Sequence, residues 1–112
     1  MKERSKALRA FLEASYMSLR DVMADQKAAI ESYKKRVPEF EVAYIEQNMK
    51  LGVDLMNTDR YRANGIGWMD PKKMCASVEV VNTYMGLPKQ VPCEQVYTNE
   101  FLTKVAMPAN MK

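Results

Sequence analysis

The chain has no histidine and only two cysteines among its 112 residues, and these shortages exclude several kinds of active site. Without histidine, a serine or cysteine nucleophile lacks its usual general base, so the common Ser-His-Asp and Cys-His arrangements are ruled out. Two cysteines are also too few for a structural zinc site, which needs four ligands. We therefore expect no enzymatic activity, no metal and no other cofactor.

The two cysteines, Cys75 and Cys93, are separated by 18 positions. Their spacing is compatible with a disulfide but does not require one. Buried or unused thiols are the expected state, with the disulfide left open as the alternative.

Long apolar runs and basic clusters are missing as well. No window approaches the ~18–20 apolar residues of a membrane-spanning helix, and the first residues, which include Glu3, are not followed by the apolar segment of a signal peptide. The chain as written is therefore expected in the cytoplasm. The 17 Lys and Arg side chains are interleaved with 14 Asp and Glu side chains, so the net charge of +3 is spread out and binding to nucleic acid is not expected.

Amphipathic helices account for most of the chain. At 112 residues, 47% of them hydrophobic, it should form one domain, residues 1–112, with one modest core. Apolar residues recur at spacings of three and four in residues 6–23, 25–36, 39–57 and 71–85, and more briefly in residues 94–105. The third stripe is broad, which predicts burial on two sides, and Gly52 within it suggests a close backbone contact there. No segment alternates as a strand does, so the sequence predicts an all-α protein with four main helices and a short C-terminal helix.

Residues 64–71 (NGIGWMDP), here called the glycine corner, form the most distinctive stretch. Gly65 and Gly67 permit backbone angles that other residues avoid, and Asp70 with Pro71 is a typical helix start. The loop presents Trp68, the only tryptophan, whose flat ring could line a pocket for a small heteroaromatic compound or organic anion. Tyr61, flanked by Arg60 and Arg62, is the second candidate ligand-binding residue. The competing interpretation, which we favour, is that Trp68 fills the junction between two helices.

Several segments, taken in order, resemble a known family. They are residues 65–71 (GIGWMDP), 84–87 (YMGL), 88–91 (PKQV) and 96–102 (VYTNEFL), together with residues 9–12 (RAFL) and 19–25 (LRDVMAD) of the first helix. The chain resembles the C-terminal part of substrate-binding proteins of ABC importers, in the subfamily that binds nitrate, sulfonates, taurine and the thiamine pyrimidine precursor.

The resemblance implies a partial lobe of a two-lobed α/β fold of the periplasmic-binding-protein type, acting in the periplasm with an ABC permease. The first lobe and most of the family's ligand contacts would precede the matched region, so binding by this chain alone would be residual at most. Residues 97–102 would then dock on the absent lobe. The related pyrimidine-synthesising enzymes depend on histidine and a cysteine-rich motif, and neither is present here.

Self-association is a further expectation from the sequence. Helices meant to pack on an absent sheet would expose apolar stripes, which are usually covered by another surface. We therefore expect a homodimer or higher oligomer. The alternative function is a small helical oligomerisation or interaction protein with no role in transport.

Overall fold

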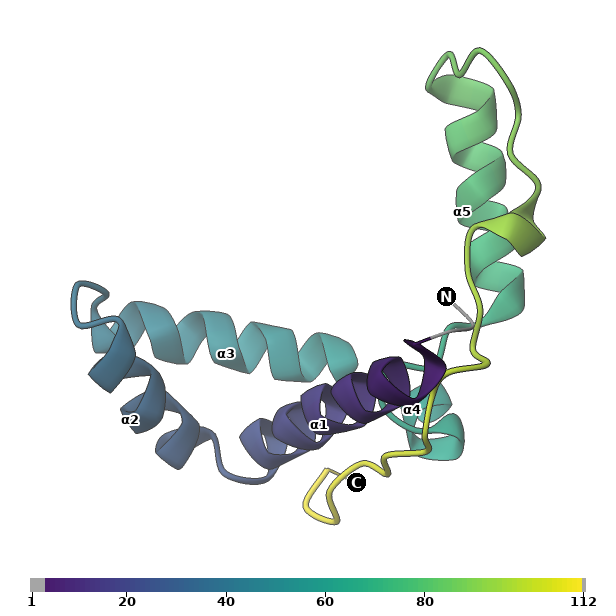
Figure 1. Ribbon diagram of the computed structural model, residues 1–112. Coiled ribbons are helices and arrows are strands. Elements are labelled where there is room, and N and C mark those ends of the chain that lie inside the picture. Colours follow the sequence, from purple (N-terminus) through teal and green to yellow (C-terminus); the bar gives the residue numbers. More distant parts are fainter. Residues whose placement is uncertain (1–3, 112) are drawn as a thin grey trace.

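The computed structural model describes residues 4–111, and within that range it is helical without strands, which confirms the predicted all-α class. Figure 1 shows the order of the elements. The five α-helices of residues 4–111 are α1 (Ser5–Ala24), α2 (Gln26–Arg36), α3 (Val42–Met56), α4 (Asp59–Asn64) and α5 (Pro71–Tyr84), and the 3₁₀ turn η2 covers Cys93–Gln95.

The predicted helix ends are confirmed where a local capping signal marks them. The side chain of Asp25 accepts a hydrogen bond from the Ala28 backbone N–H at 3.0 Å and so begins α2. Asp70 accepts from the N–H groups of Lys72 and Lys73 at 2.9 and 3.3 Å, with Pro71 in the first turn of α5. Beyond the other end of α5, Gly86 adopts a left-handed φ of 59°.

One helix start and one whole helix differ from the prediction. Helix α3 begins at Val42 rather than at residue 39, because the Lys34 ammonium donates to the Pro38 carbonyl at 2.7 Å and residues 38–40 form a turn. Helix α4 was not predicted. Its N-cap is Thr58, whose hydroxyl accepts from the Tyr61 N–H at 3.2 Å, and a helix of 6 residues is too short to show an apolar stripe.

The predicted C-terminal helix over residues 94–105 is wrong, because only the short turn η2 forms there. The backbone of this region makes isolated turns, such as the one closed by the Leu102 N–H and the Asn99 carbonyl at 3.1 Å, and the Val105 carbonyl accepts from the distant Ile66 N–H at 2.8 Å. The apolar residues Phe101 and Val105 are both buried, but they reach the interior from an extended chain. Their helix-like spacing was therefore misleading.

A small core lies where α1, α3 and the glycine corner meet residues 98–111, here called the C-terminal segment. Met23, Val53, Ile66 and Val105 form its buried cluster, and Tyr16, Leu19, Met49, Met56, Met107 and Met111 pack around it. The segment is tied down further by Asn110, which donates to the Ala24 carbonyl at 3.2 Å at the end of α1. Phe101 lies under the guanidinium of Arg9, 5.5 Å from its ring centre. Phe101 therefore packs within this chain. For this residue, the expectation that residues 97–102 dock on an absent lobe does not hold.

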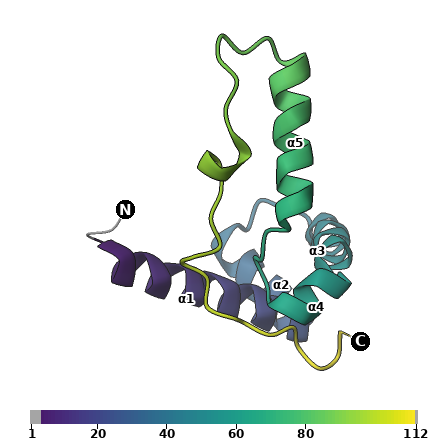
Figure 2. The ribbon, with the colours of Figure 1, turned by 90° about the vertical axis from the view of Figure 1, so that its right-hand side faces the viewer.

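Helix α5 stands away from the other helices. In Figures 1 and 2 it rises from the body, which is formed by α1–α4, and residues 87–97, here called the return segment, run back beside it. We call α5 and the return segment together the arm. The radius of gyration is 17.1 Å, whereas a compact domain of this length has about 13 Å. The accessible surface is 8648 Å², roughly 2,300 Å² more than the about 6,300 Å² of a compact monomer of 12.9 kDa. Much of the chain is therefore uncovered.

One side of α3 contributes to this uncovered surface. Ile45 and Val53 are buried against the body, but Tyr44, Leu51 and Leu55, here called the outer face of α3, are 57%, 56% and 80% exposed. The expectation that this helix is buried on two sides is thus wrong for the described residues 4–111. A Cβ added at Gly52 would meet nothing within 4 Å, so this glycine serves no close contact either.

Candidate functional site

Tyr61 and Trp68, the two residues nominated from the sequence, line the same depression. It has a volume of about 280 Å³ and lies where α3, α4 and α5 converge; we call it the joint cleft. Trp68 is half-buried and is one of the residues that line the cleft. The remaining lining residues are Leu55, Thr58, Arg60, Met69, Asp70, Lys73 and Met74.

The glycine corner sets the position of Trp68. Gly65 has φ = 98° and Gly67 has φ = 86°, both in the region that favours glycine. A Cβ at Gly65 would come within 3.1 Å of the Val105 carbonyl oxygen, and a Cβ at Gly67 would overlap the ring of Tyr16 on α1. Both glycines therefore allow close packing of the corner, on the C-terminal segment and on α1 respectively.

A reciprocal pair of hydrogen bonds holds the other side of the corner. The Met69 N–H donates to the Asn99 side-chain oxygen at 3.0 Å, and the Asn99 amide donates back to the Met69 carbonyl at 2.8 Å. Thirty positions separate the two residues. The backbone next to Trp68 is thus satisfied and fixed by a side chain from the C-terminal segment.

Asp70 joins α4 to α5 electrostatically. Its carboxylate lies 2.6 Å from Arg60 Nε and is only 18% exposed. Partial desolvation by itself raises the pKa of Asp70, but the hydrogen bonds from the Lys73 and Lys72 backbone N–H groups, with the charges of Arg60 and Lys73, outweigh it and leave the pKa below its usual value. The carboxylate is therefore charged at neutral pH and acts as a structural link across the cleft.

The arginines beside Tyr61 are less available to a ligand than the sequence suggested. Arg60 is paired with Asp70, and Arg62 is paired with Asp59 at 2.8 Å. The aromatic walls contributed by Tyr61 and Trp68 remain, together with the ammonium group of Lys73 at the start of α5. This arrangement suits a small flat or anionic group, which Trp68 and Tyr61 would contact by their rings.

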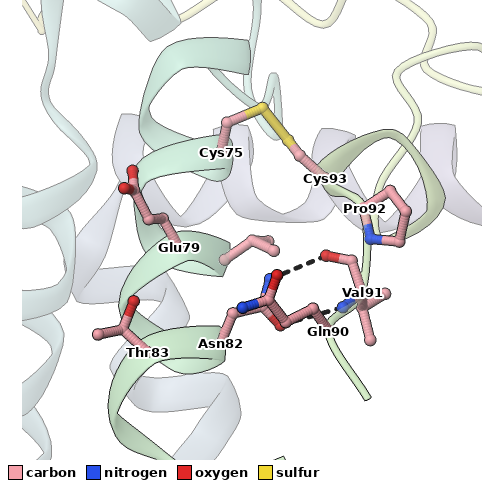
Figure 3. Close-up of a pocket in the computed structure, with 9 residues that line it drawn as sticks. Cys75, Glu79, Asn82, Thr83, Gln90, Val91, Pro92 and Cys93 are labelled. Atoms are coloured by element: carbon pink, nitrogen blue, oxygen red, sulfur yellow. Dashed lines mark hydrogen bonds between the residues drawn. A yellow bond between two sulfur atoms is a disulfide. The ribbon is translucent and has the colours of Figure 1, made fainter.

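Another depression, of about 440 Å³, lies between α5 and the return segment. Figure 3 shows that the disulfide Cys75–Cys93 and the pair Asn82–Val91 cross it. Asn82 donates to the Val91 carbonyl at 3.0 Å and accepts from the Val91 N–H at 3.1 Å. These links hold the arm together, and neither Tyr61 nor Trp68 reaches this depression.

The expectation of free thiols is wrong, because Cys75 and Cys93 form a disulfide with their Cα atoms 5.1 Å apart. The cause is the turn after α5, which reverses the chain and returns residue 93 to the side of the helix that carries residue 75. Spacing in the sequence could not reveal this reversal, although Gly86 and Pro88 signalled that the helix ends there.

No protein-family model matches this chain, and no curated protein and no solved structure matches it either. Within residues 4–111, no three side chains of His, Cys, Asp or Glu come together as metal ligands would. None of the helices in that range combines the length and the apolar character needed to cross a bilayer.

Proposed function

We propose that this chain is the C-terminal helical part of an ABC-transporter solute-binding protein for a small organic anion or heteroaromatic precursor, with at most residual ligand binding by itself. The observation that carries the proposal is the uncovered apolar surface. The total accessible surface exceeds that of a compact monomer by roughly 2,300 Å², and large apolar side chains such as Leu55, 80% exposed, lie on it; a further lobe packed there would cover them.

The outer face of α3 is the surface that we assign to the missing lobe. Its residues Tyr44, Leu51 and Leu55 follow one another at helical spacing and are exposed to solvent. Leu55 also lines the joint cleft, beside Tyr61 and Trp68. A lobe seated on this face would thus reach the cleft and close it, and ligands of two-domain proteins are usually bound at such junctions.

The disulfide supports a periplasmic location for the protein. Cys75 and Cys93 are paired, and disulfides persist in oxidising compartments such as the bacterial periplasm but are rare in the cytosol. This argues against the cytoplasmic location expected from the N-terminal residues. It agrees with the compartment in which solute-binding proteins of ABC importers work.

The proposal is tested by supplying the missing lobe. The chain is produced in an oxidising compartment together with the first lobe of a solute-binding protein of the nitrate, sulfonate or thiamine-precursor subfamily, truncated where the region resembling this chain begins. We expect a one-to-one complex by size-exclusion chromatography with light scattering. Because Trp68 is the only tryptophan, its emission in a complex with a tryptophan-free lobe should respond to nitrate, taurine or the thiamine pyrimidine precursor.

Two variants make the test specific for the outer face of α3. Leu51→Glu should abolish the complex, because it places a charge on the proposed contact, whereas Ala43→Glu, on an exposed position of the same helix away from that face, should not. A chain that is folded by circular dichroism but binds no such lobe would refute the proposal. That result would favour a small helical interaction protein instead.

A further inference from the structure

The lining of the joint cleft carries more positive than negative charge. Its charged side chains are Arg60, Asp70 and Lys73. Arg60 pairs with Asp70, whereas Lys73 forms no ion pair with another residue of the range 4–111. The Lys73 ammonium does attract the Asp70 carboxylate and helps to lower its pKa, but one carboxylate cannot neutralise two cations. Two positive groups and one negative group leave the lining with a net charge of +1.

The positive groups are also the more accessible ones. The side chain of Arg60 is 45% exposed and that of its partner Asp70 only 18%, and Lys73 is exposed in the first turn of α5. The Asp70 carboxylate is already occupied by Arg60 and by the backbone N–H groups of Lys72 and Lys73. A molecule that enters the cleft therefore meets exposed cations, which attract an anion and repel another cation.

The rest of the lining favours a flat apolar ring. Trp68 and Tyr61 are both half-buried, and Leu55, Met69 and Met74 add further apolar surface. Aromatic side chains contact a flat ring closely, either stacked on it or edge to face. The volume of about 280 Å³ is just below the roughly 300–1,000 Å³ of pockets that hold drug-sized ligands, so a single ring with one small substituent suits the cleft.

An inorganic oxyanion would use little of this lining. It could approach Lys73, but an ion pair with an exposed ammonium group contributes little by itself. The other cation, Arg60, is already held by Asp70. A molecule that combines a ring with one acidic group would contact the aromatic side chains and balance the positive charge at the same time.

We propose that the ligand of the joint cleft is a single-ring aromatic monoanion, such as an aromatic carboxylate or sulfonate. The ring contacts Trp68 and Tyr61, and the acidic group pairs with Lys73. This inference rests on the proposed function for the biological role of the cleft, and it narrows the ligand class. Small oxyanions without a ring and uncharged heteroaromatic rings are both weaker ligands.

Nuclear magnetic resonance of the purified, oxidised and isotope-labelled chain tests the ligand class, because Trp68 is the only tryptophan and its indole N–H gives a unique signal. Benzoate, benzamide, benzylamine and acetate are each titrated to about 20 mM at constant ionic strength. Benzoate should shift the signals of Tyr61, Trp68 and Lys73, with a dissociation constant about threefold to fivefold lower than that of benzamide, which has the same shape without the charge. Benzylamine, with the opposite charge, should bind more weakly than benzamide. Acetate, which lacks the ring, should leave the Trp68 indole signal in place.

Two lysine variants assign the charge to one residue. Lys73→Met should remove the advantage of benzoate over benzamide and leave the binding of benzamide unchanged. Lys72→Met is the matched control: Lys72 is the neighbouring exposed lysine, it does not line the cleft, and its substitution should preserve the advantage. Both variants keep the backbone N–H groups that Asp70 caps, and circular dichroism verifies their helix content.

Several results would overturn the inference: benzoate that shifts none of the three signals, benzamide or benzylamine that binds as tightly as benzoate, or acetate that shifts the Trp68 indole signal as benzoate does. An advantage of benzoate that survives in Lys73→Met, or that is lost in Lys72→Met, would also overturn it. No lobe of a solute-binding protein is present in this experiment. A chain that binds benzoate but no lobe would therefore contradict the proposed function alone, and a chain that binds the lobe but not benzoate would contradict this inference alone.

Discussion

Removal of the Cys75–Cys93 disulfide should loosen the arm while leaving the body folded. The described residues of α5 pack mainly on the return segment, and the disulfide closes a loop with a sequence separation of 18. For a loop of that length, the chain-entropy model gives a stabilisation of about 3 kcal/mol at 25 °C. An isolated helix of 14 residues is marginal in water, so α5 depends on this link.

Amide hydrogen exchange measures the effect residue by residue. In the double variant Cys75→Ser/Cys93→Ser, or after reduction with a dithiol, amides of α5 should exchange on the order of 100-fold faster, which corresponds to about 3 kcal/mol. Amides of α1 and α3 that surround Met23 and Val53 should change little, because that cluster receives no residue of the arm. The experiment is best done at about 1 µM, where dimers contribute least.

Treatment of the double variant with the same dithiol is the control, and it should have no further effect. The reasoning would be refuted if α5 kept its protection without the disulfide, since the Asn82–Val91 hydrogen bonds would then be sufficient to hold the arm. It would also be refuted if the whole chain lost protection together. In that case the arm and the body would unfold as one unit.

Two further predictions concern the glycines and Asp70. Gly67→Ala should destabilise the chain by about 2–4 kcal/mol in urea unfolding, because φ is 86° and the new Cβ would overlap the ring of Tyr16. Gly52→Ala should stabilise the chain by about 0.5–1 kcal/mol, because alanine is a better helix former than glycine and its Cβ would meet nothing within 4 Å. The pKa of Asp70 in the folded chain lies below the 3.8 of the free group. The contribution of this carboxylate to stability is therefore complete above about pH 3.8 and is lost as the pH falls through the lower pKa of the folded state. Asp70→Asn should remove this part of the acid dependence of the urea midpoint.

Each of these predictions has an outcome that would contradict it. Equal unfolding free energies for Gly67→Ala and the wild type would mean that Tyr16 moves aside without cost. An acid transition that is the same in Asp70→Asn as in the wild type would mean that other carboxylates dominate it, and that the Arg60 pair adds nothing measurable.

The sequence predicted the starts of the helices that combine a local capping signal with an apolar stripe. The starts of α2 and α5 were predicted from Asp25 and Asp70, because an N-cap acts on backbone groups two or three residues away. Residues 94–105 misled the prediction for the opposite reason. Their apolar spacing suited a helix, but Phe101 and Val105 are held by α1 and by Ile66, which are distant in sequence.

The candidate site was predicted in the same uneven way. Tyr61 and Trp68 were chosen because aromatic side chains on a shaped loop are useful to a ligand, and both line the joint cleft. The parts that make the cleft were not foreseen: the short helix α4, the Asp70–Arg60 pair and the Asn99–Met69 hydrogen bonds. Hydrophobic periodicity predicts none of these features, because α4 is too short to show a stripe and the two polar contacts depend on how the chain folds back on itself.

By itself, the sequence determined that this protein is helical, where α2 and α5 begin and end, and that its glycine corner is a built feature. These properties follow from backbone preferences and side-chain periodicity, which act over a few residues. Only the tertiary structure decided that Cys75 and Cys93 pair, that Tyr61 and Trp68 share a cleft, and that the arm and the outer face of α3 are left uncovered. Those outcomes depend on where distant segments meet, and the free energy of such contacts is set by burial in three dimensions.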